Sequence, residues 1–173
     1  VNQESPAYRK PFDPSQMAVV RGDSIPDEWN ALTSRVIGCA MTVHSALGPG
    51  LRESLYEEAM LHEMQLNGLH VAQQVGFRIV YKGREIGLQT IDLIVEDRVI
   101  LELKSVVQVR EVDSAQLVGY LRFTGLPLGL LINFHTPLLK DSIVRKINWP
   151  PAKTSSIQVA RVHPPPTLPP LCI

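Results

Sequence analysis

Residues 90–104 read TIDLIVEDRVILELK, two runs rich in aliphatic and β-branched residues on either side of a charged turn. Such runs predict two antiparallel strands joined by that turn. In this register Leu93 lies opposite Leu101 and Ile91 lies opposite Leu103, so one face of the hairpin is apolar. A slip by one residue would move Asp92 among aliphatic side chains, and the hydrophobic pattern therefore selects this register.

The other face of the predicted hairpin carries Asp92 directly opposite Glu102, with Lys104 two residues further on. Two opposed carboxylates repel each other in a sheet, and a bound cation would remove that repulsion. Mg²⁺ takes one or two carboxylates and keeps several waters, and it can activate water for attack on a phosphoryl group. The ammonium of Lys104 would stabilise the same developing charge. The alternative, which the pattern alone leaves open, is a solvated face of an ordinary hairpin.

The composition is typical of a globular protein, and the length of 173 residues accommodates one domain with a proper core. Its apolar runs are too short to span a bilayer, and the N-terminus lacks an export pattern. Cys39 and Cys172 are too few for a disulfide framework, so we expect a cytoplasmic protein, with Cys39 packed inside a helix. Basic and acidic residues number 17 each, and the segment 30–149 carries 12 of each. This balance predicts no tight non-specific binding to duplex nucleic acid.

Proline placement divides the chain. Of the 14 prolines, only three fall between residues 30 and 149, and seven follow residue 149. We therefore predict an N-terminal extension at 1–29, a folded domain at 30–149 and a Pro-rich tail at 150–173. The tail is either featureless or a ligand for an aromatic-lined groove.

Hydrophobic spacing within the domain predicts alternating helices and strands. The first helix starts at residue 27 or 30 and ends at 47, before Gly48-Pro49-Gly50. The second covers 53–67, with Leu55, Ala59 and Leu66 as apolar positions and Met60 flanking them. Strands follow at 71–81, 85–95 and 99–106, then a helix from 113 or 114 to 124, a buried strand at 128–134 and a short element at 142–148. This order predicts an α/β sandwich with a mixed sheet.

Two pairs of polar residues on the predicted helices are further candidates for the site. Gln116 and Tyr120 are four residues apart and share one helix face. A Gln amide can orient a phosphate or the lysine, and a Tyr can donate to a phosphate oxygen or stack on a base. In isolation, however, the pair favours the polar flank of an amphipathic helix. Glu53 and Tyr56 lie in the first turn of the second helix, where the helix dipole alone favours an acidic residue.

The segment Gly50-Leu51-Arg52-Glu53-Ser54-Leu55-Tyr56 resembles the GxxExxY motif, which names a family of small, mostly bacterial proteins in the PD-(D/E)XK nuclease superfamily. The resemblance runs through residues 36–148 and includes the run GLLINF at 129–134. It implies a restriction-endonuclease-like αβββαβ sandwich with an extra N-terminal helix. Asp92 matches the metal-binding aspartate, and Glu102-Leu103-Lys104 matches the (D/E)XK triplet. Ile91 stands where the named motif has proline.

The resemblance also implies roles for the helical residues. Gln116 to Tyr120 matches a Gln-xxx-Tyr helix, and Glu53 corresponds to the first-helix glutamate, with Glu57 as the alternative. It implies a nuclease that uses Mg²⁺, or Mn²⁺, to hydrolyse DNA or RNA. Asp92, Glu102 and Glu53 would be the metal ligands, Lys104 would assist the attacking water, and Gln116 and Tyr120 would position substrate. A nuclease-like module that binds nucleic acid or protein with little turnover is the alternative, and the neutral charge favours it.

Overall fold

The computed structural model describes residues 25–148, and the predicted order of helices and strands is confirmed there. The segment 142–148, predicted only as a short element, contains the end of a 3₁₀ helix and an edge strand. The predicted tail at 150–173 lies outside the described residues, as does most of the extension at 1–29. The elements are α1 (Asp27–Leu47), α2 (Glu53–Leu66), β1 (Val71–Tyr81), β2 (Arg84–Val95), β3 (Val99–Lys104), α3 (Glu111–Thr124), β4 (Leu128–Asn133), η3 (Leu139–Ser142) and β5 (Ile143–Ile147).

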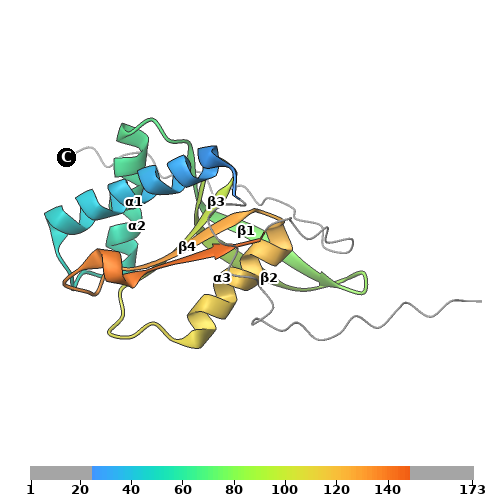
Figure 1. The fold of residues 1–173 in the computed structure, drawn as a ribbon. Helices are drawn as coiled ribbons and strands as arrows, with labels where there is room; N and C mark the ends of the chain where they lie inside the picture. The colour runs from blue at the N-terminus through green and yellow to red at the C-terminus, as the bar shows by residue number, and fades with distance from the viewer. Residues whose placement is uncertain (1–24, 149–173) are drawn as a thin grey trace, which may run out of the picture.

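The five strands form one mixed sheet in the order β1-β2-β3-β4-β5 (Figure 1). β3 and β4 are parallel, whereas the other neighbouring pairs are antiparallel. A parallel pair needs a crossover connection, and α3 supplies it. All six residues of β4 and the first five of β3 are buried, because helices cover both faces of the sheet centre.

Two apolar clusters hold the helices to the sheet, one on each face. The first joins α1 and α2 to the sheet and contains Ile25, Trp29 and Cys39. Cys39 thus packs inside a helix as predicted, and Ile25 and Trp29 of the expected extension belong to the core. The second cluster joins α3 to the opposite face. There a Cβ at Gly129 would come within 2.7 Å of Leu117 Cδ1, so α3 lies directly on β4.

Helix ends follow local sequence chemistry. α1 stops at Gly48, whose φ of 67° suits glycine and whose N–H donates to the His44 carbonyl, as the Gly-Pro-Gly run predicted. The predicted apolar stripe of α2 is wrong in part: Leu55 and Leu66 are exposed. Met60 is buried as predicted, together with Tyr56 and Met64. Within residues 25–148, the model contains no helix with the length and apolar character that crossing a membrane requires.

The predicted register of β2 against β3 is confirmed from Leu93–Leu101 to Val95–Val99, but the predicted pairing does not continue to Ile91, whose apolar assignment is also wrong. Leu93 pairs with Leu101, and both lie in the first cluster. Ile91 was expected on that same face, yet it packs in the second cluster beside Phe77. The pairing of β2 with β1 keeps one register through this region, so the strand pair rotates between Ile91 and Leu93. Asp92 lies at that rotation.

Candidate active site

Asp92 lies where β2 and β3 separate. The paired residues run from Val95 with Val99 to Leu93 with Leu101, and the ladder stops there. In place of a further backbone pair, the Leu103 N–H donates to Asp92 Oδ2 at 2.8 Å. The expected direct opposition of Asp92 and Glu102 inside the ladder is therefore corrected: the two carboxylates lie at the mouth of a strand divergence, because the Asp92 side chain takes the backbone acceptor's position.

Glu102 is buried and its two oxygens differ. Its exposed fraction is 2%, and Oε1 accepts a hydrogen bond from Lys104 Nζ at 2.7 Å. Glu102 Oε2 is buried without a hydrogen-bond partner in the described part of the chain. Burial raises the pKa of Glu102 to about 7, with the Lys104 bond lowering it and the charge of Asp92 raising it. An unpartnered carboxylate oxygen in this setting is costly unless a cation or donor approaches it.

Lys104 is the cation of the site. Its ammonium contacts Glu102 Oε1 at 2.7 Å and Glu53 Oε1 at 3.9 Å. Burial disfavours its charge, but the bond to Glu102 and the charges of Glu102, Glu53 and Asp92 outweigh burial and raise the pKa of Lys104. The group is therefore protonated and suited to stabilising negative charge.

Hydrogen bonds from Asn133 and Phe134, at and after the end of β4, fix the end of β3. Asn133 pairs with Lys104 in register, and its side-chain amide exchanges two hydrogen bonds with the backbone of Val106. The Phe134 N–H donates to the Lys104 carbonyl at 2.7 Å. Asn133 was not among the predicted site residues, although a polar residue that ends a buried strand next to the strand of Lys104 is a signal that the sequence contains.

The segment from Gly50 to Tyr56 positions Glu53 through hydrogen bonds between hydroxyl side chains and the backbone and through one stacked ring. The Tyr56 hydroxyl donates to the Gly48 carbonyl at 2.6 Å and accepts from the Leu51 N–H at 3.2 Å. The Tyr56 ring stacks on Phe134 with centroids 4.4 Å apart. Ser105 Oγ, directly after Lys104, donates to the Leu51 carbonyl at 2.6 Å. These contacts hold the first turn of α2 against the end of β3, which brings Glu53 to Lys104.

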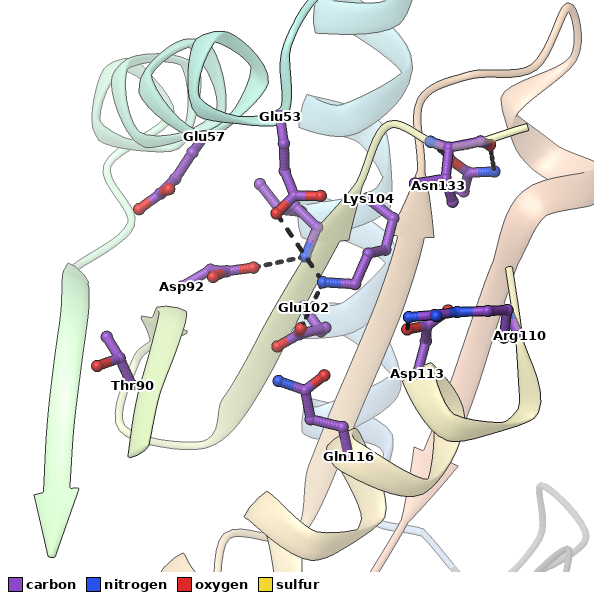
Figure 2. Close-up of polar contacts among 12 residues, drawn as sticks. Glu53, Glu57, Thr90, Asp92, Glu102, Lys104, Arg110, Asp113, Gln116 and Asn133 are labelled. Carbon is purple, nitrogen blue, oxygen red and sulfur yellow. Dashed lines mark hydrogen bonds and ion pairs between the residues drawn. The ribbon is translucent and has the colours of Figure 1, made fainter. Parts of the chain in front are cut away.

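Figure 2 shows both glutamates considered for the helix role on α2, with Glu53 above Lys104 and Glu57 on the Asp92 side of the site. Glu53 is partly exposed, with 42% of its side chain accessible. Glu57 is 8% exposed and accepts a hydrogen bond from Gln74 Nε2. Burial raises the pKa of Glu57; bonds from Gln74 and Gln73 lower it, and the charge of Asp92 adds to the rise.

Gln116 and Tyr120 share a face of α3 as expected, but they bond to each other. Gln116 Nε2 donates to the Tyr120 hydroxyl, which in turn donates to the Thr90 carbonyl at 3.0 Å. Tyr120 is 3% exposed and packs edge-on against Phe77. Its ring offers no surface for stacking on a base in this structure. In Figure 2 the Gln116 side chain extends from α3 toward Glu102.

The donor set fits a hard divalent cation. The charges of three carboxylates, Glu102, Glu53 and Asp92, act on the Lys104 ammonium. Burial is the main cause that raises the pKa of Glu57, Asp92 and Glu102. Mg²⁺ needs only one or two carboxylates, and the unpartnered Glu102 oxygen is available to it. In residues 25–148, no group of three or more His, Cys, Asp or Glu side chains is arranged closely enough to hold an ion. The three-ligand set of Asp92, Glu102 and Glu53 thus stays a prediction.

Comparison with known families agrees with this geometry. Residues 30–146 match the model of the PD-(D/E)XK nuclease superfamily. That match covers more than half of the chain, and the protein therefore belongs to this superfamily, with its restriction-endonuclease-like α/β fold. The match indicates a nuclease-like domain, of a class that usually uses divalent metals. No curated protein and no solved structure matches the chain. The narrower GxxExxY resemblance stays a prediction.

Proposed function

We propose that this protein hydrolyses phosphodiester bonds of DNA or RNA in a reaction that depends on Mg²⁺, with Mn²⁺ as a substitute. One observation carries the proposal. Glu102 Oε2 is buried and unpartnered within the described chain, in a carboxylate whose pKa is raised by burial and by neighbouring Asp92. Glu102 Oε2 therefore carries negative charge that no hydrogen-bond donor among residues 25–148 offsets, next to the point where β2 and β3 separate. A cation bound there would offset this charge.

Asp92 and Glu102 would hold the ion. Asp92 uses Oδ2 to accept the Leu103 N–H, which fixes the side chain's orientation. Mg²⁺, when bound, supplies a water of lowered pKa and offsets charge on the phosphoryl group. The rigidity of β3, buried on both faces, would keep Glu102 and Lys104 in place during the reaction.

Lys104 would stabilise the phosphoryl charge and orient the attacking water. Its raised pKa means that it donates hydrogen bonds rather than accepting a proton in the metal-free site. Glu53, in contact with the ammonium at 3.9 Å, would help to hold it until the substrate arrives. Glu53 or Glu57 would also contribute the further carboxylate of the site.

Gln116 would orient the substrate phosphate or Lys104, since its side chain extends toward Glu102 (Figure 2). Tyr120 would act through Gln116 and through the Thr90 carbonyl, two residues before Asp92. We therefore assign Tyr120 a positioning role, which revises the expectation that it touches substrate directly. The proposed cellular location is the cytoplasm.

A second function has its own support. Lys104 and Glu102 form an ion pair of 2.7 Å, which partly satisfies the site without any metal, and the sequence has no net charge. These features favour a nuclease-like module that binds nucleic acid or protein with little turnover. In that case the carboxylates would be retained for structure.

A cleavage screen separates the two functions. The purified protein is incubated with end-labelled single-stranded, duplex and branched DNA and RNA, with Mg²⁺, Mn²⁺ or EDTA. The proposal predicts cleavage of at least one substrate with metal, none with EDTA, and loss of cleavage in Glu102→Gln. Metal-independent cleavage, or cleavage that survives Glu102→Gln, would show a contaminant or a different site.

A further inference from the structure

Gln74 has an unusual backbone for its place in the fold. Among the described non-glycine residues, those with positive φ are Gln74, Lys82, Glu96 and Asp97. Lys82, Glu96 and Asp97 lie in the two hairpin turns, where this conformation is expected. Gln74, with φ of 49°, lies inside β1. A left-handed residue within a strand is strained and persists only where its surroundings enforce it.

The strained residue faces Asp92. Gln73 pairs with Leu93 and Val75 pairs with Ile91, so Gln74 and Asp92 occupy the same position along the two strands. The strand pair also rotates here. Leu93 packs in the first cluster, whereas Val75 and Ile91 pack in the second. The irregularity that turns Asp92 out of the regular alternation is thus centred on Gln74.

The Gln74 side chain reaches α2. Its Nε2 donates to Glu57 Oε1 at 2.5 Å, and Glu57 is 8% exposed. The charge of Asp92 contributes to the raised pKa of Glu57, which agrees with the two carboxylates lying near each other. In Figure 2 Glu57 extends from α2 on the Asp92 side of the site, while Glu53 extends toward Lys104. Gln74 therefore meets two carboxylate residues: its backbone lies opposite Asp92, and its side chain bonds the carboxylate of Glu57.

We propose that Gln74 is a positioning residue of the active site, acting through Glu57. Its left-handed backbone and its amide together hold the Glu57 carboxylate beside Asp92, which makes Glu57 the helix glutamate of the cation site and leaves Glu53 as the partner of Lys104. This inference rests on the proposed function. A carboxylate oriented by an amide donor is the usual arrangement behind a metal ligand.

The chain contains a matched control in the preceding residue. Gln73 Nε2 donates to Glu58 Oε1 at 2.7 Å, so the same side chain on the same strand bonds the next glutamate of the same helix. Gln73, however, pairs regularly with Leu93 and has no positive φ. A purely structural role for a glutamine–glutamate bond between β1 and α2 would apply equally to both.

The test measures Mn²⁺ binding to full-length protein by electron paramagnetic resonance, beside the melting temperature. Gln74→Gly relieves the backbone strain at this position but also leaves the buried Glu57 carboxylate without its amide donor. These effects oppose each other, so the melting temperature should change little, while Mn²⁺ affinity should fall on the order of 10-fold. Gln73 bonds Glu58 and also lowers the pKa of Glu57 to a smaller extent, so Gln73→Ala should reduce Mn²⁺ affinity much less than Gln74→Gly does. Because Gln74 acts through Glu57, adding Gln74→Gly to Glu57→Gln should cause no further loss.

Three results would overturn the inference. These are equal effects of Gln74→Gly and Gln73→Ala, unchanged Mn²⁺ affinity in Gln74→Gly, and additive losses in the double variant. The wild-type measurements distinguish this failure from failure of the proposed function. Wild-type protein that binds Mn²⁺ and cleaves, while Gln74→Gly matches it, refutes only the role of Gln74. Wild-type protein that neither binds Mn²⁺ nor cleaves refutes both.

Discussion

Asp92 Oδ2 accepts the backbone N–H of Leu103 at 2.8 Å, which joins the side chain of one strand to the backbone of its neighbour. The bond ends the β2–β3 ladder and leaves Asp92 Oδ1 for another partner. Burial raises the pKa of Asp92; the Leu103 bond and Lys104 lower it, and Glu53 raises it. The carboxylate therefore combines a structural bond with a destabilising charge, and substitutions can separate the two.

Asp92→Asn should keep the bond from Leu103, because an amide oxygen also accepts, while the charge disappears. We expect an unchanged or higher free energy of unfolding in urea and no Mg²⁺ binding by calorimetry. Asp92→Ala is the control, since it loses the acceptor and should lower the free energy of unfolding by about 1–3 kcal/mol. A large loss of stability in Asp92→Asn with Mg²⁺ binding retained would give Asp92 a structural role.

Metal-free stability should fall as the pH rises from about 4.5 to 7. The pKa of Glu102 is raised from 4.5 to about 7, so the folded state holds a proton that the unfolded state has released in this range. The stabilising contribution is complete below the unfolded value and lost as the pH passes the folded value. Melting temperatures in EDTA measure this, and Glu102→Gln should flatten the slope. A wild-type melting temperature that rises through this range would contradict the raised pKa.

Much of the fold was predictable, because it depends on local hydrophobic spacing. The Leu93–Leu101 register and the end of α1 at Gly48 followed from alternation and turn chemistry. The rotation at Asp92 was not predictable, since it depends on the left-handed backbone of Gln74, a residue with no turn signature. Two adjacent glutamines interrupting the alternation of β1 were its one visible trace.

The candidate site shows the same division. The pattern indicated that Asp92, Glu102 and Lys104 gather, since it specifies which residues face each other. It could not show that Tyr120 points inward, because a helical spacing of four gives a shared face without saying what that face meets. Contact with Phe77 and with the Thr90 carbonyl decides the orientation, and both arise from tertiary packing.

Tyr120→Phe tests that orientation. The phenyl ring should keep its place against Phe77, but the bond to the Thr90 carbonyl and the bond from Gln116 are both lost. We expect the free energy of unfolding to fall by about 1 kcal/mol in urea titrations. The free energy of nucleic-acid binding should change by less than this. If Tyr120 instead stacked on a base, phenylalanine would preserve stacking, and stability would not change.

The most direct test of the account is the single-turnover cleavage rate of Lys104→Ala at saturating Mg²⁺, measured beside Mg²⁺ affinity. Lys104 is held protonated by Glu102, Glu53 and Asp92, so its loss removes an electrostatic stabiliser of the reaction. We expect a rate lower by a factor on the order of 10²–10³, with Mg²⁺ binding nearly intact. Wild-type protein that binds Mg²⁺ but cleaves no nucleic acid, with Lys104→Ala behaving as wild type in every binding assay, would contradict catalysis and define an interaction module on this fold.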